Sequence, residues 1–193
     1  MKKRRNFMLN PPETITGTRI ILKKADKTFK QAQISLAEVD ASRAELYPWL
    51  GWASPSYGLE DAYEYLQGCD KEWKEGKGYN YMLCDLSGQF MGMISALNVN
   101  EDYKSLEIGY WISTRFAGRG FMKEAVRLIE KEFFALGINR IAIHTDVLNI
   151  KSANVPQKLG YRLEGILRQS SWNRAEDKFR DINVFAKLKG EYK

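Results

Sequence analysis

Two glycines separated by one residue, Gly118 and Gly120, stand between a stretch with the pattern of a β-strand and one with the pattern of an α-helix. The strand-like stretch reads LEIGYWIST, the turn reads RFAGRG and the helix begins with FMKEA. Glycine is favoured where the backbone adopts a positive φ or comes close to a ligand. The chain must therefore fold so that a strand ends, turns sharply and starts a helix here.

The helix predicted after this turn covers residues 121–136. Apolar residues at helical spacing predict its buried face, made of Phe121, Met122, Ala125, Val126, Ile129, Phe133 and Leu136. Charged residues between them predict a face toward water, made of Lys123, Glu124, Arg127, Glu130 and Lys131. Gly137 then suits a C-terminal cap.

The start of this helix predicts an anion site. The first turn of a helix leaves several backbone N–H groups unpaired, and the helix dipole adds roughly half a positive charge there. A phosphate or pyrophosphate is therefore the expected guest, and Arg115 and Arg119 could add charge-assisted hydrogen bonds. The alternative is a tight turn without a ligand, because short glycine matches are common.

Two familiar phosphate-binding loops do not fit. The chain has no GxxxxGK run followed by Ser or Thr. The spacing of a dinucleotide-binding loop fails because Lys123 occupies the third glycine position. The sequence thus predicts a phosphate-binding turn of another kind.

The remaining patterns predict a mixed α/β fold in one domain over residues 1–193, with residues 1–12 flexible. An antiparallel meander over residues 79–112 is followed by a strand, helix, strand, helix order. Strands are predicted over residues 18–24, 79–86, 89–99, 105–112, 140–147, 161–172 and 179–188. Further helices are predicted over residues 28–39, 42–50, 59–74 and 151–159.

Composition narrows the class of protein. A hydrophobic content of 44% supports a real core, and neither an 18-residue apolar run nor the apolar region of a signal peptide is found, so a cytoplasmic protein without a membrane segment is expected. Cys69 and Cys84 predict free thiols, and a single histidine argues against a metal site. The net charge of +6 favours anionic partners, but no motif indicates specific nucleic-acid binding.

The motifs together resemble the GNAT superfamily of acyl-CoA-dependent N-acetyltransferases. Arg115, Gly118 and Gly120 match its [QR]-x-x-G-x-[GA] signature at the start of a helix. Asn149 and Ser152 match the second element of the subgroup that acetylates ribosomal-protein N-termini. Four further features are similar to that subgroup: EIGYWI, the Lys158-Leu159-Gly160 run, LEG at residues 163–165, and Asp181. Tyr161, which follows the run, stands where Phe is commoner in the family. The resemblance implies a mixed, mostly antiparallel sheet of about six to seven strands flanked by helices.

The resemblance also implies a site for acetyl-CoA as co-substrate, with no metal. The turn amides would hold the pyrophosphate, and the pantetheine arm would run beside a strand edge. The residues implied in coenzyme binding are Trp111, Ile112, Arg115, Phe116, Ala117, Gly118, Arg119, Gly120, Phe121, Asn149 and Asn154. For Asn149, the helix N-cap is an alternative role.

Acetyl transfer to an amine requires that the amine lose a proton and that the departing thiolate receive one. Glu107, a carboxylate in an apolar strand, is the first candidate for the base or amine-orienting group. A surface ion pair is its alternative role, and Asp146 and Glu164 are weaker candidates. Ser152 is the acid that the subgroup implies, with a helix cap as its alternative.

The acid assignment departs from the wider family. Many GNAT members have a tyrosine at the position of Pro156, which cannot donate a proton. Pro156 also predicts a kink or an irregular end in the short helix.

The acceptor site is expected from aromatic residues. The walls of this site could be formed by Trp49 and Trp52, which lie with Tyr47 in the loop LYPWLGW, and by Tyr110. Trp172 could equally line the site or pack in the core. The alternative is that these rings seal the core. A Cys84–His144 nucleophile pair is disfavoured, and core packing is expected for both.

The function predicted is direct transfer of the acetyl group of acetyl-CoA to a primary amine, with the N-terminal α-amino group of a protein such as a ribosomal protein as the expected acceptor. One alternative is a small amine, a polyamine or an aminoglycoside. The other is a non-catalytic acyl-CoA-binding regulator. A homodimer is compatible with the sequence.

Overall fold

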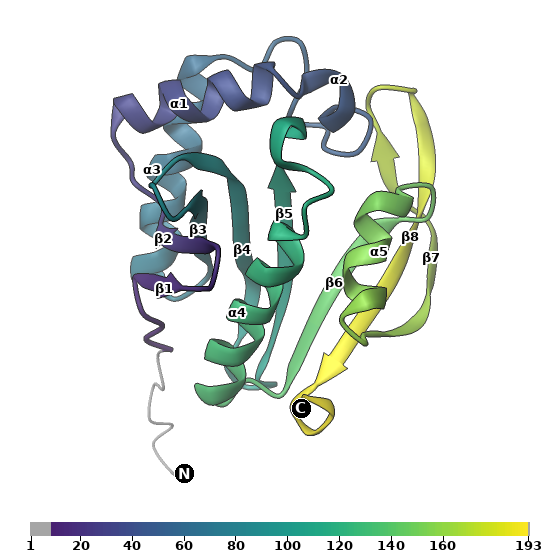
Figure 1. Ribbon diagram of the computed structural model, residues 1–193. Helices are drawn as coiled ribbons and strands as arrows, with labels where there is room; N and C mark the ends of the chain where they lie inside the picture. Colours follow the sequence, from purple (N-terminus) through teal and green to yellow (C-terminus); the bar gives the residue numbers. More distant parts are fainter. Residues whose placement is uncertain (1–8, 193) are drawn as a thin grey trace.

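The computed structural model describes residues 9–192 and contains one mixed sheet with the strand order β1-β2-β3-β4-β5-β6-β8-β7 (Figure 1). The strands are β1 (Thr14–Thr16), β2 (Ile20–Lys24), β3 (Tyr79–Asp85), β4 (Phe90–Asn100), β5 (Ser105–Ile112), β6 (Arg140–Asp146), β7 (Arg162–Asn173) and β8 (Lys178–Leu188). The α-helices are α1 (Phe29–Asp40), α2 (Arg43–Leu46), α3 (Leu59–Glu75), α4 (Phe121–Ala135) and α5 (Ile150–Lys158). Short 3₁₀ turns, η1 (Thr114–Phe116) and η2 (Lys189–Glu191), complete the described chain.

Pairing in the sheet is antiparallel except between β5 and β6. This confirms the predicted mixed, mostly antiparallel sheet. The sheet has eight strands where six to seven were expected. The additional strand is β1, for which no strand was predicted, and it pairs with β2 from Thr14–Lys23 to Thr16–Ile21.

The two halves of the sheet separate between β5 and β6. Their parallel pairing covers only three residues of each strand, ending at Glu107 and Ala142. Beyond that point β5 stays paired with β4 as far as Ile112, and β6 stays paired with β8 as far as Asp146. Figure 1 shows the two strands spreading apart from this junction. One backbone edge of β5 is therefore left open beside the gap.

Helices cover the two faces of the sheet differently. On the first face, α4 packs on a core that includes Leu106, Ile108, Ile141 and Ile143, and α5 lies on the same side (Figure 1). On the second face, α1 and α3 pack on a separate core that includes Trp111. Because side chains alternate along a strand, neighbouring residues of β5 and β6 point to opposite faces.

The predicted helix is present as α4, and most of its apolar stripe is buried as expected. Phe121 and Leu136, at its two ends, are only partly buried. Glu130, which we assigned to the water-facing side, is 1% exposed and lies 2.8 Å from Lys187 Nζ on β8. The carboxylate is buried because β8 supplies an ammonium group that the local pattern does not reveal.

Two other segments differ from the sequence-based description. The helix predicted over residues 42–50 is limited to α2, since Pro48 has no N–H to donate to the carbonyl four residues earlier. Within the stretch expected to be flexible, residues 1–8 lie outside the described part. Leu9 is buried, and the hydroxyls of Tyr79 and Tyr81 donate hydrogen bonds to the carbonyls of Leu9 and Pro12.

Candidate active site

The turn before α4 presents a row of free backbone donors. Gly118 and Gly120 adopt left-handed geometry, with φ of 78° and 83°. Within residues 9–192, no acceptor is found for the N–H groups from Gly118 to Lys123. Neither glycine has an atom within 3.4 Å of the position that a Cβ would occupy. An anion can therefore approach this backbone closely, at the positive end of the helix dipole.

A basic hollow of about 590 Å³ adjoins the turn. Its cationic lining residues are Arg19, Arg119, Lys123, Arg127 and Lys131. The carboxylate in this lining, Glu124, accepts hydrogen bonds from Arg19 Nε and from two backbone N–H groups of residues 18 and 19. Because Glu124 is already engaged, the hollow stays electropositive and suits a phosphorylated ligand.

Arg115, which was expected to contact the anion, forms an ion pair with α1. Its guanidinium group is paired with the carboxylate of Glu38 on α1, with Nε 3.2 Å from Oε2 and a second bond from Nη2 to Oε1. Glu38 is 6% exposed. This doubly bonded pair, whose carboxylate is buried while the Arg115 side chain is largely exposed, fixes the turn on α1. The backbone amides and Arg119 remain available to bind an anion.

The start of α5 is built around Asn149 and Ser152. The Asn149 side chain accepts from the Ser152 N–H at 3.0 Å and caps the helix, so the alternative role considered for it is present. Pro156 lies inside α5 and has no N–H for the Ser152 carbonyl, four residues earlier. The Tyr110 hydroxyl donates to this carbonyl at 3.0 Å, and Ser152 Oγ donates to Tyr110 Oη at 3.3 Å.

Tyr110 therefore links β5 to α5 beside the opening between β5 and β6. Burial raises the pKa of its hydroxyl to about 12. Tyr110 remains protonated at neutral pH, so its hydroxyl can donate to the Ser152 carbonyl while it accepts from Ser152 Oγ. Sequence reasoning assigned Tyr110 to the acceptor walls, but its side chain lies on the first face with Ser152, because period two separates it from Trp111.

Glu107 and His144 meet on the second face. Glu107 Oε1 lies 3.3 Å from His144 Nδ1, and Glu107 Oε2 accepts from Asn98 Nδ2 at 3.2 Å. His144 is exposed, so the expectation that it packs in the core is wrong: Ile141 and Ile143 take the core positions of β6 and turn His144 outward. The period of the strand could have indicated this.

The aromatic loop of residues 47–52 also reaches the second face. The Trp52 ring lies 5.9 Å from the Trp111 ring, in an edge-to-face arrangement. The Trp49 carbonyl accepts from Arg180 Nη1 at 2.9 Å, which ties the loop to β8. Trp52 is 39% exposed, so it offers part of its ring to a ligand while Trp111 is buried.

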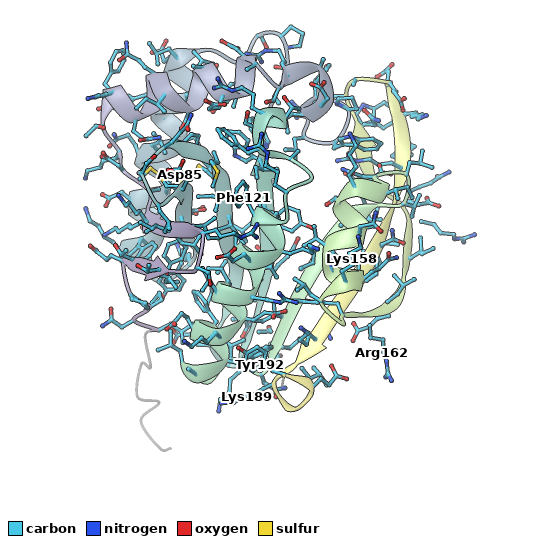
Figure 2. All side chains as sticks on the ribbon, viewed as in Figure 1. Asp85, Phe121, Lys158, Arg162, Lys189 and Tyr192 are labelled. Carbon is cyan, nitrogen blue, oxygen red and sulfur yellow. The ribbon has the colours of Figure 1, made fainter. Side chains whose placement is uncertain are left out.

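The remaining predicted residues are spread around these features. Ile112 and Phe116 are partly buried against the first core, Ala117 is exposed in the turn, and Phe121 opens α4 with Arg19 Cζ 5.0 Å from its ring centroid. Asn154 is exposed on α5. Figure 2 shows Phe121 on α4 and Lys158 on α5, the two helices that flank the opening. Trp172 stacks edge-to-face on Phe179 in the β7–β8 hairpin.

The two weaker carboxylate candidates are both in ion pairs. Asp146 Oδ2 lies 3.8 Å from Arg180 Nη1, and Glu164 is bonded to Arg140. Among residues 9–192, no cluster of three or more His, Cys, Asp or Glu side chains is arranged to hold a metal ion. The same part of the chain contains no helix with the length and apolar character needed to cross a bilayer.

Both cysteine thiols are buried and free, and burial raises the pKa of Cys69 to about 12 and that of Cys84 above its usual value. Since the thiolate is the reactive form, we expect neither thiol of the native protein to react with a disulfide reagent at about pH 8. Both should react once urea unfolds the chain. Rapid labelling of the native protein would show that at least one thiol is accessible.

Comparison with known proteins agrees with this arrangement. The family model described as the acetyltransferase (GNAT) domain matches residues 19–162. The Bacillus subtilis (strain 168) protein YdaF is 37% identical over 106 residues, which are 54% of this chain and 57% of YdaF, so the match spans little more than half of that relative. The ribosomal-protein-serine acetyltransferase of Escherichia coli (strain K12) is 26% identical over 140 residues, 72% of this chain and 76% of that protein.

A solved structure has the same fold. RimL, a ribosomal L7/L12 α-N-protein acetyltransferase in complex with coenzyme A, superposes with a TM-score of 0.84 at 24% identity, covering 91% of this chain and 98% of RimL.

Proposed function

The chain belongs to the GNAT acetyltransferase family, and from this membership we propose that it transfers the acetyl group of acetyl-CoA to the N-terminal α-amino group of a protein. The observation that carries the proposal is the row of unpaired N–H groups from Gly118 to Lys123, at the head of α4 and beside the gap between β5 and β6. A ribosomal protein is the acceptor in this proposal, because relatives of the chain act on ribosomal proteins.

The residues around the turn fit acetyl-CoA. A diphosphate needs several convergent donors, close backbone approach and positive charge, and the turn with its basic hollow offers all three. The open edge of β5 lies where an extended pantetheine arm could run toward Ser152. When bound, acetyl-CoA supplies an activated acetyl group as a thioester.

The acceptor amine approaches from the second face. Glu107 and the exposed part of Trp52 lie on this face, whereas the turn and Ser152 belong to the first face. In this proposal the amine and the thioester meet from opposite faces where the pairing of β5 and β6 ends. Glu107 is a carboxylate held by Asn98, which suits the orientation of an ammonium group.

Ser152 is the proton donor to the departing sulfur. Its hydroxyl lies at the start of α5 beside the gap, and the helix dipole there favours the negative charge that develops on sulfur. Tyr110, held on the Ser152 carbonyl that Pro156 leaves free, fixes the position of that hydroxyl.

The proposal is tested by measuring coenzyme A release with two panels of acceptors. One panel contains peptides with free N-termini and the other contains polyamines and aminoglycosides. We expect transfer to peptides, with mass spectrometry locating the acetyl group on the α-amine. If only small amines are acetylated, the acceptor is a small amine and not a protein N-terminus. Tight binding of acetyl-CoA without any turnover would indicate a regulator.

Ser152→Ala should lower kcat by about 100-fold or more, the usual contribution of a positioned acid. The affinity for acetyl-CoA should stay the same, because Asn149 caps α5 through the Ser152 backbone and not through its side chain. Steady-state kinetics and calorimetric titration measure the two quantities. Ser87→Ala, in the exposed turn between β3 and β4, is the control. Unchanged kcat in Ser152→Ala would remove Ser152 as the acid.

The compartment in this proposal is the cytoplasm, where acetyl-CoA and newly made proteins meet. No specific binding of nucleic acid is part of the proposal.

A further inference from the structure

His144 is the only histidine in the sequence, and the function proposed above gives it no task. It extends from β6 onto the second face, where the acceptor amine approaches, and its partner is Glu107. The two side chains join β5 and β6 at the point where the parallel pairing of these strands ends. The pair therefore lies at the base of the gap.

The hydrogen bonds around the pair orient the imidazole. His144 Nδ1 faces Glu107 Oε1 at 3.3 Å, and Asn98 holds the other carboxylate oxygen at 3.2 Å. Within residues 9–192, His144 Nε2 has no partner. The His144 side chain is 35% exposed and that of Glu107 is 24% exposed, so water reaches the ring more readily than the carboxylate. Nε2 is therefore the free basic atom of the pair.

The other charged groups on this face already have partners. Along β6, Arg140 is bonded to Glu164, and Asp146 lies 3.8 Å from Arg180 of β8. On β8, the residue directly opposite His144 is Val184, which is not titratable. Glu107 is therefore the charged group that faces the imidazole.

Proton affinity distinguishes the imidazole from the carboxylate as the base. An α-amino group ordinarily titrates at about 7.7–8.0, an imidazole at about 6.5 and a glutamate at about 4.3. A general base works best when its proton affinity is close to that of its substrate and to the working pH. An imidazole ordinarily has a proton affinity closer than that of a carboxylate both to an α-amine and to neutral pH. A carboxylate within hydrogen-bonding reach of Nδ1 is also the arrangement that orients a catalytic histidine.

We propose that His144, oriented by Glu107, is the general base that deprotonates the acceptor amine. The assignment rests on the proposed acetyl transfer. Nε2 takes one proton from the ammonium group and later releases it to water. The freed lone pair of nitrogen forms the C–N bond to the acetyl carbon, and the C–S bonding pair leaves with sulfur. Ser152 gives a proton to sulfur and regains one from nitrogen, which balances the reaction.

The test is the pH dependence of kcat/KM for a peptide acceptor in His144→Gln. Near pH 7 we expect a loss of about 100-fold, within the usual range for a general base. The loss should shrink as pH rises through about 8, since solution then supplies the neutral amine directly. Added imidazole should restore part of the activity of His144→Ala. The acetyl-CoA affinity and the melting temperature of both variants should match those of the wild type.

Glu107→Gln separates the two possible bases. With His144 as the base, Glu107→Gln loses less activity than His144→Gln. The reverse order, with an unchanged pH profile in His144→Gln, would overturn the assignment and make Glu107 the base. Glu164→Gln, a carboxylate change elsewhere on this face, is the control. Absence of any transfer by the wild type would instead contradict the proposed function.

Discussion

Gly120→Val should abolish the binding of acetyl-CoA. The residue has φ of 83°, where a β-branched side chain is strained, and its amide belongs to the row of free donors. An added Cβ would lie 3.5 Å from Arg19 Nη2 and 3.7 Å from Lys123 Cε, so the further methyl groups of valine would crowd the cations beside the turn. Hydrogen bonds to charged groups contribute about 1.5–3 kcal/mol each, so the loss of two weakens binding by roughly 100-fold or more. Calorimetric titration with acetyl-CoA measures the change.

Gly137→Val is the matched control. Gly137 follows the other end of α4 with φ of 99° and has no atom within 4 Å of an added Cβ. Both substitutions should therefore cost a similar 1–2 kcal/mol or so of stability, but only Gly120→Val should lose the coenzyme. If both variants bind acetyl-CoA as the wild type does, the turn is not the diphosphate site.

Local patterns in the sequence predicted the elements that build the site. The glycine spacing and the apolar stripe that follows predicted the turn and α4, because helix starts and amphipathic faces depend on residues three or four positions apart. The meander of β3, β4 and β5 was predicted for the same reason, since short turns join its strands. Pro156 predicted a further local feature, because its missing N–H leaves the Ser152 carbonyl without a helical partner. The Tyr110 hydroxyl donates a hydrogen bond to this carbonyl.

Partners distant in sequence could not be predicted in this way. Arg115 and its partner Glu38 are 77 residues apart, and nothing around Arg115 indicates α1. An arginine beside a glycine turn predicts an anion ligand equally well, so only the packing of α1 on the sheet decides between the two roles. The opening between β5 and β6 is also a long-range property, because it depends on how many residues of two separate strands pair.

The same limit applies to the faces of the strands. Period two showed that Glu107, Gly109 and Trp111 share one side of β5, but not which layer covers that side. Without the layers, Tyr110 and Trp52 both looked like acceptor walls. The fold separates them, with Tyr110 beside α5 and Trp52 against Trp111. An aromatic residue therefore acquires a definite role only when its neighbours across the sheet are known.

The buried ion pair between α4 and β8 carries the second large prediction. Lys187 Nζ lies 2.8 Å from Glu130 Oε1, and the two side chains are 8% and 2% exposed. Lys187→Met keeps the length of the side chain but leaves the carboxylate without its partner. Removing one member of a buried pair costs about 3–5 kcal/mol, which for a chain of this size lowers Tm by roughly 6–20 °C. Urea titration and calorimetry measure the loss.

The double variant Lys187→Met/Glu130→Leu tests why Lys187→Met alone lowers the stability. If the cost is an unpaired buried charge, removing the carboxylate as well should recover most of the stability, since an apolar pair can replace a buried ion pair. Arg140→Met breaks the exposed pair with Glu164 and should cost less than about 1 kcal/mol. If Lys187→Met proved no worse than Arg140→Met, Glu130 would have to find water or another donor, which would contradict the burial of the pair.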